Sequence, residues 1–219
     1  MFDTTYPQAI GLCSGALLLT SVLMVWRHSL LASLRLLALQ GLALAALVAV
    51  IGIKAADWEL LLVALLVLVV KGGVLPWILA RQSRATTRTI DESPRLNPTA
   101  ALLAVAGLTV LSYVVLGRIL ASVTTVTAQA APIGLSMVLI GFLLLLARRR
   151  ARSQLIGFLL LDNGIATVAF LTSGGVPLFL ELGISLDVLL VVVILYVFTG
   201  RMRTKFGGTD VDTLRELHD

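Results

Sequence analysis

The sequence predicts an all-α integral membrane protein with seven transmembrane helices, its N-terminus outside and its C-terminus cytoplasmic. Composition gives the first indication: 58% of the 219 residues are hydrophobic, only 13% are charged and the mean hydropathy is +1.02. A soluble domain has about twice that share of charged residues. The other two indications are the lengths of the apolar runs and the distribution of basic residues between them.

Seven apolar runs have the length of a transmembrane helix, which needs about 20 residues to cross ~30 Å of hydrocarbon. The first run follows MFDTTYPQ, which lacks the basic segment of a signal peptide, so we expect it to be retained as a span. Pro98 directly after Asn97 is typical of a helix start, and Gly200 of a helix end. The predicted spans are residues 7–26, 31–53, 58–80, 98–120, 131–147, 154–172 and 177–199.

The basic residues indicate the orientation of these spans. Fourteen of the 17 lysines and arginines lie in or beside the first, third and fifth connections or in the tail, which all fall on one side. Lys54 and Arg118 fall on the other side, and Lys71 lies within a span. Because basic residues collect on the cytoplasmic side, the N-terminus is expected outside. The net charge of +5 has the same explanation and does not indicate nucleic-acid binding.

Two polar segments are long enough to lie in water, the connection 81–97 and the tail 200–219. Thr209 or Asp210 is placed to cap a short helix in the tail. Neither segment has enough residues to fold as a domain. They are interpreted either as solvated surface or as docking segments for a cytoplasmic partner.

Three ionisable residues lie deep within the predicted spans: Lys71, Asp162 and Asp187. Each costs about 2.5–3.5 kcal/mol at the centre of a membrane helix. From the rise of a helix, Asp162 lies about 12 Å from the inner edge, Asp187 about 15 Å and Lys71 about 20 Å from the outer edge. All three are therefore expected at one level, in the middle third of the membrane. Glu181 lies about 6 Å in from the outer side.

A carboxyl group at this level is a candidate for proton transfer. Apolar surroundings favour its neutral form and a nearby ammonium group favours its charged form, so it can gain and lose a proton as these influences change. Proton pumps use buried carboxylates as relays in this way. The predicted proton-path residues are Asp162, Asp187, Lys71, Glu181 and Asn163. The alternative interpretation is structural, with a Lys–Asp ion pair or hydrogen bonds between helices.

The segment VKGGVLPW places Gly72, Gly73 and Pro76 directly after Lys71. Proline removes one helix hydrogen bond and usually kinks the chain, and neighbouring glycines weaken a helix further. The span is therefore predicted to be interrupted here, as in transporters that bind ions at broken helices. A simple packing kink is the alternative.

An internal repeat is indicated by the segments LRLLALQGLALAAL and IGFLLLDNGIATVAF, in which Gln40-Gly41 aligns with Asn163-Gly164. Each segment follows a basic turn. The chain is accordingly predicted to contain a three-helix unit with its cytoplasmic loop at 1–97, a linking helix at 98–120, a second three-helix unit at 131–199 and a cytoplasmic tail at 200–219.

The run IGFLLLDNGI and the later segment PLFLELGISLDVLLVVVILYVF resemble the E component of hydrogenase-4, a membrane subunit of formate hydrogenlyase-type, group 4 nickel–iron hydrogenase complexes. The family's acid-Asn-Gly run is met from Asp162 to Gly164, and its ELGI-x-x-D pattern by residues 181–187. Its membrane lysine followed by a proline is met by Lys71 and Pro76. The tail FGGTDVDTLREL also looks like the family's ending, so the resemblance covers nearly the whole chain.

The last three predicted spans are in turn similar to the small K-type (NuoK-like) subunit of respiratory complex I and to the C subunit of Mrp antiporters. Those subunits have three spans in the same orientation, with one acid on the second and one on the third. The third-span acid falls on Asp187, and the second-span acid falls near Leu159, one helical turn before Asp162. The sequence departs there from the K-type pattern but keeps an acid on the same helical face.

The resemblance implies a non-catalytic membrane subunit of a redox-driven complex in the cytoplasmic membrane of a prokaryote, whose buried charges take part in moving protons or Na⁺. The implied partners are antiporter-like membrane subunits and a hydrogenase-type membrane anchor with a cytoplasmic arm, which makes a hetero-oligomer. We expect no cofactor or metal, because one Cys and two His give no ligand spacing. A purely structural spacer and a subunit of a stand-alone Mrp-type antiporter are the alternatives.

Overall fold

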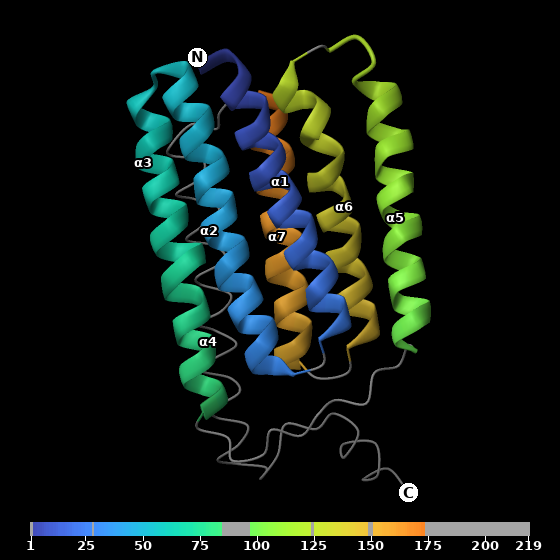
Figure 1. Cartoon of the computed structure of the whole chain (residues 1–219). Helices are drawn as coiled ribbons and strands as arrows, with labels where there is room; N and C mark the ends of the chain where they lie inside the picture. Colours follow the sequence, from blue (N-terminus) through green and yellow to red (C-terminus); the bar gives the residue numbers. More distant parts are fainter. Residues whose placement is uncertain (1, 28, 85–96, 124, 149–150, 174–219) are drawn as a thin grey trace, which may run out of the picture.

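The computed structural model describes residues 2–27, 29–84, 97–123, 125–148 and 151–173, and its regular secondary structure there is helical. Six helical rods in these ranges are long and apolar enough to cross a membrane, so the chain is a multi-pass membrane protein. They lie side by side and alternate in direction (Figure 1). The rods are α1 (Phe2–Trp26), α2 (Leu30–Ala55), a rod made of α3 (Trp58–Val67), the π-helix η1 (Leu68–Val74) and α4 (Leu75–Arg84), then α5 (Pro98–Ile119), α6 (Val126–Ala147) and α7 (Ala151–Ser173). The seventh predicted span, 177–199, and the tail 200–219 lie outside the described residues.

Local signals explain where these helices begin. The predicted start at Pro98 is confirmed: the side chain of Asn97 accepts a hydrogen bond of 3.3 Å from the N–H of Thr99. α6 begins at Val126, earlier than the predicted residue 131, because the hydroxyl of Thr125 caps the helix. The helix therefore includes the polar residues before Pro132. α1 also begins before the predicted residue 7, at Phe2.

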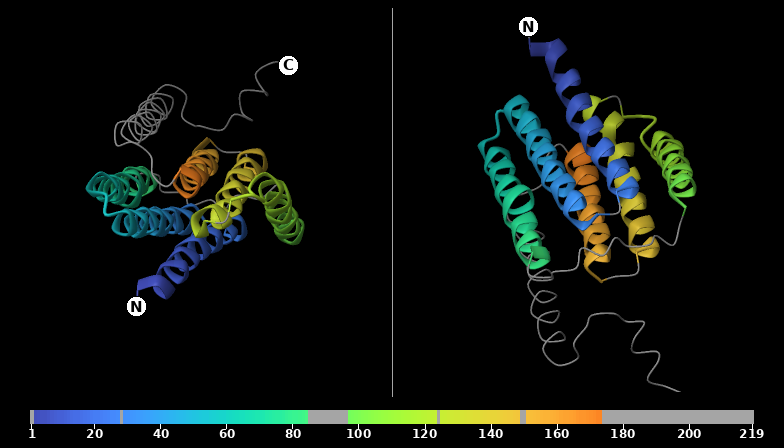
Figure 2. Two further views of the ribbon diagram at one scale, coloured as in Figure 1. Left: turned by 90° about the horizontal axis from the view of Figure 1, so that it is seen from above. Right: turned by 60° about the horizontal axis from the view of Figure 1, so that its bottom comes forward.

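Four helices form the centre of the bundle. α1 packs against α2 and α6, while α7 packs against α6 and α2. The rod α3–η1–α4 covers α2 on one side, and α5 covers α6 and α1 on the other (Figure 2). α5 is the least buried of these rods, since only 17% of its apolar stretch is buried.

The contact between α6 and α7 is the most extensive in the bundle and rests on glycines. A Cβ atom on any of four glycines would lie 2.6 to 2.9 Å from an atom of the opposite helix. These are Gly134 and Gly141 on α6, and Gly157 and Gly164 on α7. Small residues allow membrane helices to approach closely and to gain packing energy where no hydrophobic effect operates between them. α7 is therefore held firmly against α6.

Candidate functional site

Lys71 of η1 and Asp162 of α7 form a buried ion pair. Nζ of Lys71 lies 2.8 Å from Oδ2 of Asp162, and their side chains are only 2% and 10% exposed. Two charges this far from water are each expensive, and their mutual attraction offsets part of that cost. The structure thus brings together two of the residues that the sequence predicts for one level of the membrane.

The π-helix presents Lys71 to α7. The N–H of Leu75 donates to the carbonyl of Val70, five residues back, which is the hydrogen bond of a π-helix. At Gly72, Gly73 and Pro76, where the sequence predicts an interruption, the rod remains helical but changes from α to π at Leu68 and back at Leu75. Pro76 is the second residue of α4, directly after η1, and has no N–H to donate to the preceding π turn. π segments are frequent at functional sites.

Gly41 of α2 lies directly against the backbone that carries Lys71. A Cβ atom at Gly41 would lie 2.6 Å from the carbonyl carbon and oxygen of Lys71 and from the nitrogen of Gly72. Such a distance requires the backbone to move, because no flexible side chain is there to give way. The absence of a side chain at Gly41 therefore lets α2 and η1 meet backbone to backbone at the level of the ion pair.

A second group of polar side chains, here called the amide network, joins α7, α2 and α1. Asn163 Nδ2 donates to Gln40 Oε1 at 3.1 Å, and Gln40 Nε2 donates to Ser21 Oγ at 2.8 Å. The hydroxyl of Ser21 in turn donates to the carbonyl of Leu17 at 2.7 Å. All three side chains are buried, with Gln40 and Ser21 at 0% exposure and Asn163 at 3%. Gln40 and Ser21 were missed as site residues from the sequence.

The two polar groups are adjacent on α7. Asp162 turns toward η1 and Asn163 toward α2, as expected for neighbouring residues on a helix that rotates about 100° per residue. One turn later, the hydroxyl of Thr167 donates to the carbonyl of Asn163 at 2.7 Å. The remaining predicted acids, Glu181 and Asp187, lie outside the described residues. The proton-path roles of all these residues stay predictions.

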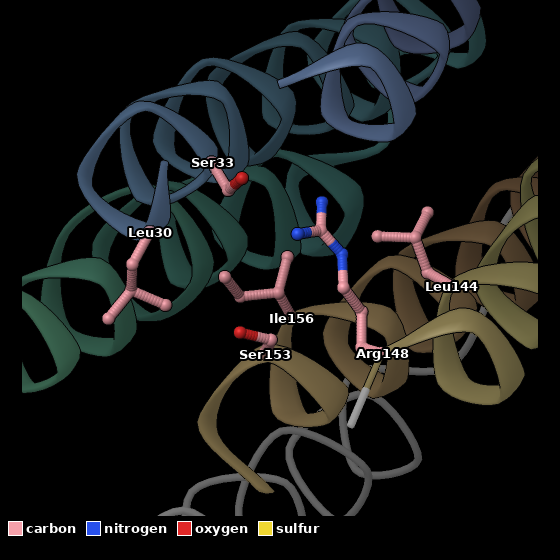
Figure 3. Close-up of a pocket in the computed structure, with 6 residues that line it drawn as sticks. All are labelled: Leu30, Ser33, Leu144, Arg148, Ser153 and Ile156. Carbon is pink, nitrogen blue, oxygen red and sulfur yellow. The ribbon is translucent and has the colours of Figure 1, made fainter. Parts of the chain in front are cut away.

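Arg148 makes a further buried contact at the end of the bundle opposite the N-terminus. Its Nη2 donates to the carbonyls of Met24 and Arg27, at 3.3 and 2.8 Å, and so caps the C-terminal end of α1. A cation at a helix C-terminus is favourable. Figure 3 shows its side chain directed into the space between Ser33 and Leu144, within a small pocket. The sequence places Arg148 among the basic residues beside the fifth connection, and only the structure reveals its contact with α1.

No group of three or more His, Cys, Asp or Glu side chains is placed to hold a metal ion among the residues described above. The chemistry that the site offers is therefore that of one carboxyl, one ammonium group and neutral amides. Such a set can hold or move a proton or a cation, while the amides orient their neighbours.

Comparison with known proteins finds relatives that match along the whole chain or nearly all of it. The chain is 44% identical over 220 residues to the uncharacterized protein Rv0085 of Mycobacterium tuberculosis, with 100% of both chains covered. It is 24% identical over 213 residues to hydrogenase-4 component E of Escherichia coli, strain K12, and of Shigella flexneri, with 97% of this chain and 99% of each relative covered. No family model and no solved structure matches the chain.

Proposed function

The chain belongs to the same family as the uncharacterized protein Rv0085 of Mycobacterium tuberculosis, and from that premise we propose that it is a membrane subunit of an energy-converting redox complex of the hydrogenase-4 type. In this proposal the Lys71–Asp162 pair contributes to the movement of protons or Na⁺, coupled to electron transfer in a cytoplasmic arm. Support comes from the nearly full-length similarity to hydrogenase-4 component E and from six helices suited to a membrane.

The single observation that carries the ion-moving part is the buried ion pair. An apolar pair of similar volume usually stabilises a protein interior as well as an ion pair does, or better. Stability alone is therefore a weak reason for two charges at this depth, and ionisable residues inside membrane helices commonly belong to ion pathways. The pair also has suitable chemistry, because a carboxyl and an ammonium group are both able to carry a proton.

The proposal includes the surroundings of the subunit. Its partners are antiporter-like membrane subunits and a hydrogenase-type membrane anchor that carries the cytoplasmic arm, assembled in the cytoplasmic membrane of a prokaryote. The subunit is not itself the catalyst of the redox reaction. Glu181 and Asp187, from the last predicted span, complete the proposed path together with Asp162.

The test uses the intact complex, purified gently through a tag on the full-length chain and reconstituted into lipid vesicles. Asp162→Asn removes the charge at nearly unchanged volume, and Asp162→Glu retains a carboxyl. The matched control is Ser112→Ala, because Ser112 is fully buried on α5 and donates only within its own helix, to the carbonyl of Leu108. Ions moved per electron transferred are measured together with the subunit composition.

We expect Asp162→Asn, although less stable than the original protein, still to assemble but to lose most ion movement per electron, whereas Asp162→Glu retains part of it and Ser112→Ala all of it. An unchanged ratio in both Asp162→Asn and Lys71→Met would reject the ion-moving role and favour a structural spacer. Purification with antiporter-like subunits but no redox subunit would favour the stand-alone antiporter instead.

A further inference from the structure

Gln40 and Gly41, two consecutive residues of α2, contact the two helices that carry the ion pair. Gln40 accepts a hydrogen bond from Asn163, whose neighbour on α7 is Asp162. Gly41 lies against the backbone of Lys71 itself. The helices that carry the carboxylate and the ammonium group thus both contact the same short stretch of a third helix.

The contact through Gln40 fixes the position of α7. Its side chain is fully buried and uses both ends, accepting from Asn163 through Oε1 and donating to Ser21 through Nε2. A buried amide that loses a partner pays the cost of desolvation, so sliding or rotation of α7 against α2 is opposed. Because Asn163 adjoins Asp162, the same bond limits how far the carboxylate can move.

The contact at Gly41 fixes the position of η1. The distance of 2.6 Å from a Cβ atom at Gly41 to three backbone atoms of Lys71 and Gly72 leaves no space for even one methyl group. Any side chain there would push η1 away from α2. The glycine therefore determines how deeply the Lys71 backbone is seated.

We propose that Gln40 and Gly41 are positioning residues that set the separation between Lys71 Nζ and Asp162 Oδ2. Gln40 is not itself a relay in this proposal, because an amide does not take up or release protons in ordinary solution conditions. The relevance of this positioning to ion movement rests on the proposed function, but the geometry does not.

The test measures the reaction of Asp162 with dicyclohexylcarbodiimide in membranes that contain the full-length chain. This apolar reagent modifies protonated carboxyl groups in membranes, so a carboxylate held beside an ammonium group reacts slowly. Modification of the peptide that contains Asp162 is followed by mass spectrometry. Lys71→Met removes the pair altogether and defines the fastest rate.

The principal variants are Gly41→Ala and Gln40→Met. We expect each to raise the rate of Asp162 modification about fivefold or more, the factor that corresponds to about 1 kcal/mol. The matched control for the first is Gly107→Ala on α5, where an added Cβ meets nothing within 4 Å. Ser112→Ala, in a buried position on the same helix, is the control for the second.

An amide exchange separates positioning from general loosening of the fold. Gln40→Asn alone shortens the side chain by one methylene, so its amide no longer reaches Asn163 and Ser21, and is expected to raise the modification rate. Adding Asn163→Gln restores the combined length of the two side chains, and the rate should return to within about twofold of the original if the bond itself matters. These two milder substitutions also provide the test if Gly41→Ala or Gln40→Met does not accumulate in the membrane.

Rates in Gly41→Ala and Gln40→Met equal to the original, or raised equally in the two α5 controls, would overturn the positioning role. An exchange that fails to restore the rate would overturn it for Gln40. These outcomes are independent of the proposed function, because modification is measured without driving the complex. Conversely, unchanged ion movement in both Asp162→Asn and Lys71→Met would reject the proposed ion-moving role and leave the positioning result intact.

Discussion

Removing one charge of the Lys71–Asp162 pair is expected to destabilise the protein more than removing both. At 2.8 Å the attraction between the two charges is about 6 kcal/mol for an effective dielectric constant of about 20. A single substitution loses this attraction while the remaining charge keeps its desolvation cost. Breaking a buried pair in this way typically costs about 3–5 kcal/mol.

The double variant Lys71→Met with Asp162→Asn leaves no charge behind. Its remaining cost is that of a buried amide with an incomplete set of partners, about 1–3 kcal/mol. It should therefore be more stable than either single variant, by about 2 kcal/mol. The sign of this difference is the critical result, since it requires the two side chains to interact.

The free energy of unfolding can be followed by tryptophan fluorescence of the full-length chain in mixed micelles with increasing denaturing detergent. Ser112→Ala, remote from the pair on α5, provides the control for general damage. Additive costs of the two single substitutions, with the double variant the least stable of the three, would refute the pairing. The double-mutant cycle is the appropriate measurement because it isolates the pairwise contribution.

Three further predictions concern packing and helix ends, and each can be checked in the same unfolding experiment. Gly164→Ala should destabilise the protein by about 1–3 kcal/mol, since its Cβ would lie 2.6 Å from Val138 N, whereas Gly107→Ala meets nothing and should change little. Arg148→Gln should cost about 1.5–3 kcal/mol through loss of its charged hydrogen bonds at the end of α1, and unchanged stability would contradict the cap. Ala56→Gly should stabilise the turn between α2 and α3 by up to about 1 kcal/mol, because Ala56 has a left-handed φ of 53°, and lower stability would contradict strain there.

Hydropathy and the residues that typically start or end helices predict the described helices well. The spans predicted at 31–53 and 98–120 agree closely with α2 and α5, because lipid imposes one length and one polarity on any helix that crosses it. The clearest boundary, at Asn97 and Pro98, depends only on local chemistry. The starts of α1 and α6 were predicted too late, since a helix can extend beyond the hydrocarbon into polar sequence, and for α6 the cap at Thr125 marks how far it extends.

Helix rise also predicts that Lys71 and Asp162 lie at similar depth, but not that they face each other. Facing depends on the rotation of each rod about its axis, and the π turn of η1 changes that rotation for Lys71. Gly72, Gly73 and Pro76 mark a weak place in the helix. Whether the chain breaks, kinks or adopts π geometry there depends on the partner helices.

Gln40 was missed as a site residue because it is uncharged and, unlike Asn163, has no acidic residue beside it. The signal that identifies it is an amide in the middle of an apolar span, where a polar side chain usually hydrogen bonds to another helix. Its alignment with Asn163 in the proposed repeat gave a second signal. The structure shows that these two aligned amides are each other's hydrogen-bond partners, which no feature of the alignment itself requires.

The distribution of contacts around the ion pair indicates which side of it is able to move. Asp162 belongs to α7, whose backbone is seated against α6 through glycines such as Gly134 and Gly164, so displacing α7 would disturb the most extensive contact of the bundle. Lys71 belongs to η1, where π geometry and Gly72 lower the cost of a local change. If the charge of Asp162 changes, we therefore expect η1 to shift its position rather than α7. Because η1 is seated on Gly41 and Asn163 of α7 hydrogen bonds to Gln40, α2 contacts both sides of the pair, and it limits how far η1 can shift.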